Sequence, residues 1–181
     1  MLTSLLVLAL ATLGAPALAQ KVRLATSEGD IVLELDAAKA PKTVDNFLQY
    51  VRAGHYDGLI FHRVIDGFMV QGGGYKPDLS EKTTRKPIPL ESRNGLSNVR
   101  GSVAMARTNV PDSATAQFFI NVNDNQRLDA GEGRDGYAVF GKVAEGMDVV
   151  DKIRVVPTRA QGPHQNLPVT PVTIRKATVE K

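Results

Sequence analysis

The decisive stretch of this sequence is Phe61-His62-Arg63-Val64-Ile65-Asp66-Gly67-Phe68-Met69-Val70-Gln71-Gly72-Gly73. Side chains alternate across a strand, so the residues on either side of Asp66-Gly67 sort into two faces. The Asp-Gly pair is a strong turn signal, because glycine adopts positive φ without steric cost. The stretch therefore predicts two strands joined by a turn. The side chains expected to converge on it, as a patch able to bind a peptide, are Arg63, Phe68, Met69 and Gln71.

The composition fits one β-rich domain. The chain has 181 residues, of which 43% are hydrophobic and 16 are glycine, so it can bury a sizeable core. Its formal net charge is +3, and lysine and arginine form no basic run, so we expect no nucleic-acid partner. The sequence has no cysteine, which excludes disulfides, thiolate chemistry and a lipoprotein anchor.

Residues 1–19 have the pattern of a secretory signal peptide. An uncharged apolar run from Leu5 to Leu13 is broken by Pro16, and Ala17-Leu18-Ala19 has the small-x-small spacing that precedes a cleavage site. The segment has no basic residue near its start, and a membrane anchor or a disordered tail are the alternatives. The apolar run is shorter than the ~20 residues that span a bilayer. We therefore expect cleavage before Gln20, a periplasmic location and no membrane association after the signal is removed.

The remaining sequence predicts about eight strands and two helices. Pro41 suits the first turn of a helix whose apolar stripe is Val44, Phe47, Leu48 and Val51, and which Gly54 ends. The second helix is expected over residues 146–154. Strands are expected at 21–26, 31–35, 61–65, 69–73, 102–106, 117–121, 137–143 and 169–179, and long loops at 74–98, 123–136 and 161–168.

Strands and helices do not alternate along the chain, so a parallel sheet is not expected. Closing an antiparallel sheet into a barrel removes its edges. The predicted fold is therefore predominantly β, a closed eight-stranded antiparallel β-barrel capped by two α-helices over its open ends. A monomer is expected, because no heptad pattern or exposed apolar helix is present.

Several classes of enzyme site are absent from the sequence. His55, His62 and His164 lack metal-ligand spacing, so no metal site is expected. No G-x-S-x-G nucleophile motif occurs, and the triple glycine at 72–74 lacks the Gly-Lys-Ser/Thr of a phosphate loop. Close backbone approach at a strand end is the favoured interpretation of those glycines. The sequence thus points to an enzyme without covalent chemistry or a cofactor, or to a protein that is not an enzyme.

The decisive stretch resembles the signature of the cyclophilins, the cyclosporin-binding family of peptidyl-prolyl cis-trans isomerases. The resemblance continues over residues 20–181 as one domain, in Met105-Ala106, Gln117-Phe118-Phe119-Ile120, Leu128-Asp129 and Val139-Phe140-Gly141-Lys142-Val143. With the signal peptide, it is similar to the bacterial periplasmic branch. The resemblance implies a barrel fold, proline-containing polypeptides as substrates, and no cofactor.

The resemblance also implies the roles of individual residues. Arg63 and Gln71 would be catalytic, with Arg63 aimed at the twisted X-Pro amide. Phe68, Met69, Phe119 and Leu128 would line the proline slot, and closure of the barrel would bring its two halves together. The full set expected to bind substrate is His62, Phe68, Met69, Ala106, Arg107, Gln117, Phe119, Leu128 and Tyr137.

Three positions depart from the best-known eukaryotic pattern. Arg127 stands where a cyclosporin-binding tryptophan is usual, so weak cyclosporin binding is expected. Arg107 replaces an asparagine, and Tyr137 replaces a histidine. Two other hypotheses remain open from the sequence: a proline-peptide binding or chaperone module with little turnover, and a barrel that only scaffolds partners.

Overall fold

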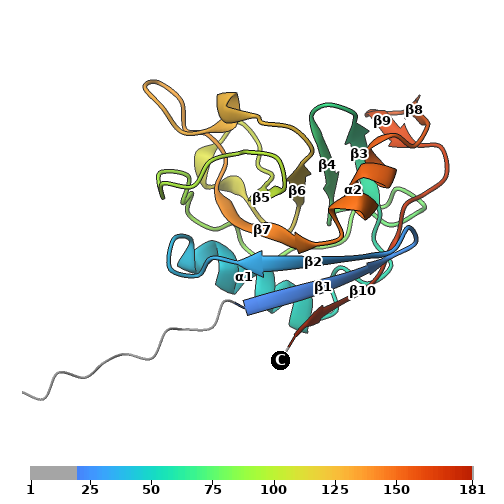
Figure 1. The fold of residues 1–181 in the computed structure, drawn as a ribbon, viewed down its shortest axis with the longest axis horizontal. Helices are drawn as coiled ribbons and strands as arrows, with labels where there is room; N and C mark the ends of the chain where they lie inside the picture. The colour runs from blue at the N-terminus through green and yellow to red at the C-terminus, as the bar shows by residue number, and fades with distance from the viewer. Residues whose placement is uncertain (1–19, 181) are drawn as a thin grey trace, which may run out of the picture.

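The computed structural model describes residues 20–180, so the predicted signal peptide lies outside the described residues. These residues form a curled eight-stranded antiparallel sheet, two α-helices and a separate two-stranded hairpin (Figure 1). The strands are β1 (Gln20–Thr26), β2 (Asp30–Leu35), β3 (Phe61–Ile65), β4 (Met69–Gly72), β5 (Ser102–Met105), β6 (Phe118–Asn121), β7 (Val139–Glu145), β8 (Thr158–Gln161), β9 (His164–Pro168) and β10 (Ile174–Val179). The α-helices are α1 (Pro41–Arg52) and α2 (Met147–Arg154), and short 3₁₀ turns cover η1 (Pro111–Ser113) and η2 (Gln126–Leu128).

The sheet is curled but its ladder is not closed, so the predicted closed barrel is wrong in this respect. The strand order is β10-β1-β2-β7-β5-β6-β4-β3, and the two edge strands do not pair with each other. The segments before these two strands meet at one isolated bridge, Ile60 with Thr173. Two backbone hydrogen bonds flank it, from Phe61 N to Val172 O at 2.9 Å and from Ile174 N to Leu59 O at 2.8 Å. The contact between the two edges is limited to this bridge and its two flanking hydrogen bonds, which do not make a ladder.

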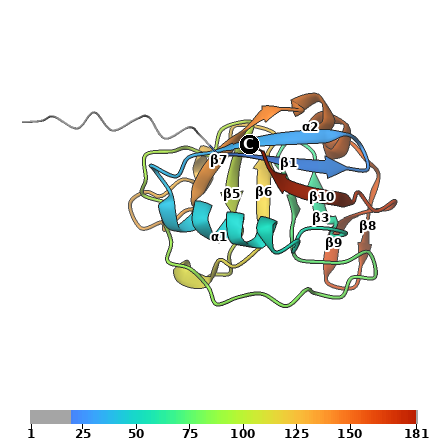
Figure 2. The ribbon, with the colours of Figure 1, turned by 90° about the horizontal axis from the view of Figure 1, so that it is seen from below.

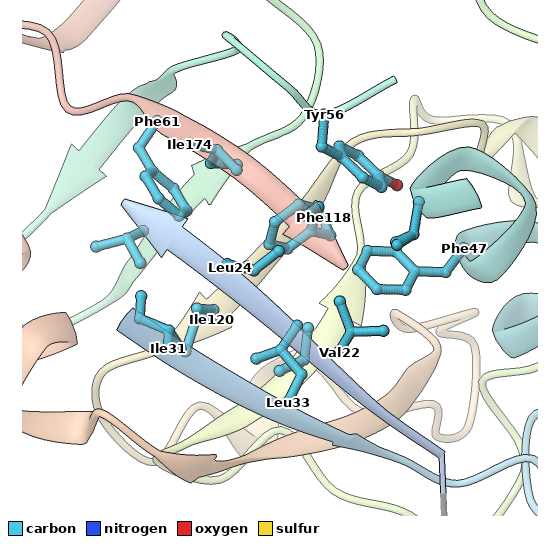
Figure 3. Packing of buried hydrophobic residues seen from close by; sticks show 14 of the residues in the cluster. Val22, Leu24, Ile31, Leu33, Phe47, Tyr56, Phe61, Phe118, Ile120 and Ile174 are labelled. Atoms are coloured by element: carbon cyan, nitrogen blue, oxygen red, sulfur yellow. The ribbon is translucent and has the colours of Figure 1, made fainter. Parts of the chain in front are cut away.

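One large apolar core fills the inside of the curled sheet. Alternate residues of the strands point into it. The helices α1 and α2 lie on different sides of it, as the two views show (Figures 1 and 2). Phe47 of α1 packs edge-on against Phe118 of β6, with ring centroids 5.5 Å apart. Figure 3 shows this core from close by, with side chains from β1, β2, α1, β6 and β10 meeting in it.

The two helices begin and end close to where the sequence indicates. Pro41 is the first residue of α1, and its apolar stripe is buried in the core. Gly54, just past the helix end, has φ +62°, which suits a residue that terminates a helix. For α2, Gly146 is the N-cap, and Val149, Val150 and Ile153 are buried.

The C-terminal region differs from the prediction. Residues 161–168 were expected to be a loop, but β8 and β9 form a hairpin there, with Gly162 at φ +56° in its turn. All four residues of β8 are exposed, and only two residues of β9 are buried. A hairpin with so little apolar surface has no alternating hydrophobic pattern to detect. The last strand is also shorter than expected and begins at Ile174.

A bulge at His62 sets the faces of β3. Phe61 pairs with Gly72 and Arg63 pairs with Gln71, so two steps on β3 match one step on β4. In a regular strand, residues three apart point to opposite faces. The extra residue of the bulge instead lets both Phe61 and Val64 enter the large core. The His62 side chain is buried, with its ring 4.7 Å from Tyr75 and 5.9 Å from His164 of β9.

A chain of buried side-chain hydrogen bonds ties the loop 123–129 to the sheet. Asn121 of β6 is fully buried, and it donates to Asn98 Oδ1 at 3.1 Å and to Ser102 Oγ at 2.9 Å. Its own Oδ1 accepts from Asn125 Nδ2 at 2.8 Å. Asn98 in turn donates to Asp129 Oδ1 at 2.8 Å. The loop is therefore held to the sheet by buried side-chain amides.

We expect Asn121→Leu to destabilise the protein by about 3 kcal/mol, because the substitution removes the donor to the buried Asn98 Oδ1 and one of the two acceptors of Asn125 Nδ2. Urea unfolding measures this change. Asn123→Ala, at an exposed position two residues away, is the matched control and should unfold like the wild type. Equal stability of the two variants would show that the network is not needed.

Burial, together with His164 and Arg63, lowers the pKa of His62 from 6.5 to about 4. The folded protein thus disfavours the proton that the unfolded chain binds, so this histidine makes stability fall as the pH falls from about 6.5 to about 4. The loss from this one group is up to about 3 kcal/mol. In urea unfolding at several pH values, His62→Phe should lose less stability between pH 7 and pH 4 than the wild type. If stability fell equally with pH in the two proteins, the lowered pKa of His62 would be contradicted.

Candidate active site

A second apolar cluster lies on the opposite face of the sheet from the large core. Adjacent strand residues divide between the two faces: Phe118 and Ile120 enter the core, whereas Phe119 joins the second cluster. The buried members of this cluster come from β4, β5, β6 and β7, and they are Met69, Ala104, Phe119 and Val139. Partly buried side chains surround them, namely Ile65, Phe68, Leu96, Ala106, Leu128 and Tyr137. The predicted slot residues Phe68, Met69, Phe119 and Leu128 are therefore brought together.

The two halves of this cluster meet through direct pairing of β4 with β6. Gln71 is opposite Phe119 in that ladder, and Met69 is opposite Asn121. Strands about fifty residues apart in sequence are therefore neighbours, and the site does not require closure of the barrel. The expectation that closure joins the halves was wrong, because the sequence does not reveal which strands pair.

Arg63 and Gln71 form a polar rim beside the cluster. They are cross-strand partners on β3 and β4, and Arg63 Nη1 donates to Gln71 Oε1 at 3.4 Å. Gln71 Nε2 donates to Gln117 Oε1 at 3.0 Å, so the amide group of Gln71 is held from both sides. The Arg63 side chain is exposed, and its remaining N–H groups are able to reach a ligand.

Phe68 lies near two guanidinium groups. It follows the Asp66-Gly67 turn, where Gly67 has φ +69° and Phe68 N donates to Ile65 O at 3.1 Å. Arg63 Cζ is 6.0 Å from the centre of the Phe68 ring, and Arg127 Cζ is 4.9 Å from it. Both distances permit cation–π attraction. Asn125 Nδ2 also donates to Phe68 O at 2.8 Å, so the buried amide chain fixes this side of the slot.

The other side of the slot contains Tyr137 and Arg107. The Tyr137 ring packs edge-on against Phe119, with centroids 5.6 Å apart. Arg107 Cζ is 4.8 Å from the Tyr137 ring centre, and Arg107 Nε donates to Gly136 O at 2.9 Å. Tyr137 N donates to Leu128 O at 2.9 Å, which holds this wall against η2.

Close backbone approach explains the glycines that follow β4, as the sequence indicated. Gly73 has φ +88°, and a Cβ there would lie 3.0 Å from Ala116 O. A Cβ on Gly74 would lie 2.6 Å from Nε2 of Gln117, whose Oε1 accepts the hydrogen bond from Gln71. Any side chain at residue 74 would therefore displace part of the polar rim.

One predicted residue lies apart from the others. His62 packs with Tyr75 and His164 and is not part of the second cluster. Its role in substrate binding stays a prediction that the placement does not favour. Sequence reasoning missed Asn125, which holds Phe68 and η2, because an asparagine in a polar loop gives no sign of burial.

No group of three or more metal-ligating side chains is found within residues 20–180. None of the helices in that range is long and apolar enough to cross a membrane. A cavity of about 810 Å³ lies beside β2 and β7 and shares only Leu96 and Val139 with the second cluster. The site around Phe68 is an apolar cluster bordered by the guanidiniums of Arg63, Arg107 and Arg127, which suits a peptide segment.

The sequence is similar to that of a known family over almost all of the described residues. The family described as "Cyclophilin type peptidyl-prolyl cis-trans isomerase/CLD" matches residues 21–179. A protein named "Peptidyl-prolyl cis-trans isomerase cyp18" from Streptomyces antibioticus is 59% identical over 161 residues, covering 87% of this chain and 97% of its own length. "Peptidyl-prolyl cis-trans isomerase B" from Escherichia coli is 54% identical over 159 residues, covering 86% and 97%.

Solved structures show the same fold. A cyclophilin-type peptidyl-prolyl cis-trans isomerase from Cryptosporidium parvum, solved in the presence of the dipeptide Ala-Pro, superposes with a TM-score of 0.75 at 26% identity. The match covers 90% of this chain and 99% of that one. The curled sheet, the slot and the match over almost the whole described region together show that the chain belongs to the cyclophilin-type peptidyl-prolyl cis-trans isomerases.

Proposed function

We propose that this chain accelerates the rotation of X-Pro bonds in exported polypeptides, with Arg63 stabilising the twisted amide. The observation that carries the mechanism is the position of Arg63. Its guanidinium lies at the edge of the apolar cluster, beside the Phe68 ring and hydrogen-bonded to Gln71. The names of the relatives support the reaction class.

The reaction is rotation about a partial double bond with a barrier of roughly 18–20 kcal/mol. Twisting the amide breaks its resonance and leaves a lone pair on the proline nitrogen. A donor aimed at that nitrogen, or at the displaced carbonyl, binds the twisted state more strongly than the planar one, and so lowers the barrier. No proton needs to be transferred, and an arginine remains charged at every physiological pH.

The slot would hold the proline ring against Phe119, Met69 and Leu128. Burying an apolar ring against these side chains fixes the substrate, so that the amide is presented to Arg63. Gln71 would hold the guanidinium in place through its oxygen, since its amide nitrogen is bound by Gln117.

The substrate backbone would lie along Ala106 and Arg107. These residues follow the last ladder pair of β5, Met105 with Phe118. The N–H of Ala106 already donates to Gln117 O at 3.0 Å. The group of Ala106 that would bind the substrate backbone is therefore its carbonyl, which would accept a hydrogen bond from a substrate N–H.

Arg63→Ala should reduce kcat/KM on an Ala-Pro peptide by about 10²–10³-fold, because it removes the transition-state donor. Arg63→Lys keeps the charge but loses the fork of donors, and should recover only part of the activity. NMR exchange or a protease-coupled assay measures both rates. Unaltered catalysis by Arg63→Ala, with peptide binding also unaltered, would exclude this mechanism, and no acceleration by the wild type would exclude the activity.

Export is tested on the mature protein. The sequence 1–19 supports a cleavable signal, so the protein purified from the periplasmic fraction should begin at Gln20. Amino-terminal sequencing gives the answer. Recovery of the uncleaved chain in the cytoplasmic fraction would contradict both cleavage and export.

A further inference from the structure

Three arginines surround the slot, and within residues 20–180 none of them forms an ion pair. Arg63 and Arg127 lie beside Phe68, and Arg107 lies beside Tyr137 on the other wall. Six other basic residues do pair with carboxylates, namely Arg23, Arg100, Lys142, Lys152, Arg154 and Lys176. Six further arginines of the described residues also lack an ion pair, namely Arg52, Arg85, Arg93, Arg134, Arg159 and Arg175. What distinguishes Arg63, Arg107 and Arg127 is that their guanidiniums lie against the aromatic side chains of the apolar slot.

The carboxylates closest to these arginines along the chain are engaged elsewhere. Asp66 pairs with Arg154 of α2. Asp124 accepts the backbone N–H of Arg100 at 2.9 Å. Asp129 accepts hydrogen bonds from Ser97 and Asn98. Within residues 20–180, none of these three carboxylates forms an ion pair with Arg63 or Arg127.

Burial raises the pKa of Asp129, but hydrogen bonds from Ser97 and Asn98 outweigh this and leave its pKa below the ordinary value. The carboxylate is therefore ionised, and its hydrogen bonds hold it to the loop 97–98. Arg127, two residues earlier, is exposed, and its guanidinium contacts the Phe68 ring rather than Asp129.

The guanidiniums retain N–H groups for a ligand. Arg107 uses Nε on Gly136 O and Nη1 on Thr108 O, which anchors its side chain and leaves other N–H groups open. The side chain of Arg127 has no hydrogen bond to another residue within 20–180, and it is positioned by the aromatic ring alone. A carboxylate accepts bidentate hydrogen bonds from such a guanidinium, which gives direction as well as charge attraction.

We propose that this site prefers proline peptides that carry an aspartate or glutamate side chain next to the X-Pro bond. Arg127 is the principal determinant of this preference and Arg107 is the second. The proposal rests on the proposed isomerase function, since Arg63 remains assigned to the reacting amide. An exposed ion pair contributes modestly, so the preference is expected to be about threefold in kcat/KM at low ionic strength.

The test uses pairs of peptides that differ only by Glu or Gln, scanned over the two residues before and the two residues after proline. NMR exchange measures kcat/KM without a coupling protease. At one or more positions the Glu peptide should isomerise about threefold faster than its Gln partner at low salt, and about 0.5 M salt should reduce the ratio towards one, because screening weakens exposed charge pairs. The Gln peptides serve as internal references for each protein.

Variants assign the preference to residues. Arg127→Gln should remove most of the Glu/Gln ratio, and Arg127→Glu should reverse it in favour of a Lys peptide. The matched control is Arg52→Gln, at an exposed arginine of α1, a helix that packs on the large core on the other face of the sheet. This control should keep the full ratio.

The outcomes separate the two proposals. Equal rates for Glu and Gln peptides at every position, with clear acceleration of both, would overturn the acidic preference and leave the isomerase function intact. A Glu preference that persists in both Arg127→Gln and Arg107→Gln would overturn the residue assignment. No acceleration of any peptide would overturn the isomerase function itself.

Discussion

The pairing of β4 with β6 is the constraint on which the site depends. It places Gln71 opposite Phe119, so one ladder joins the polar rim to the apolar slot. Because strand side chains alternate, the same ladder also sends Val70 and Ile120 into the large core. A slip of one residue would exchange the two faces and bury the rim. The stability of the core and the geometry of the site are thus fixed by one register.

This arrangement gives one sheet two apolar faces with different purposes. The inner face forms the large buried core, to which α1 and α2 both contribute, whereas the outer cluster is small and bordered by polar groups. An exposed apolar surface is a liability unless it is limited in size or has a ligand. The buried amide chain from Asn98 to Asn125 limits it here, by holding η2 and its Leu128 against the strands.

Much of the fold and the site could be predicted from local patterns. The turn at Gly67 and the α1 stripe follow from side-chain spacing, and the outer cluster contains Met69 and Phe119, as the family resemblance implied. The sequence could not predict that His62 lies apart from the other site residues, because the order of polar and apolar residues does not reveal a bulge. The hairpin β8–β9 could not be predicted either, because it lacks alternating apolar residues. It packs on β3, which is distant in sequence. The roles of the site residues, including weak cyclosporin binding at Arg127, stay predictions.

The bulge in β3 has a consequence for how this protein can vary. Substitutions at residue 62 alter one side chain, but removal of that residue would remove the bulge and change the orientation of Phe61, the one residue before it in β3. Phe61 would then leave the core for the outer face, while Arg63 kept its place opposite Gln71. Changes in chain length should therefore be rare between residues 61 and 72 and far better tolerated in the exposed β8–β9 hairpin, which carries no part of the slot.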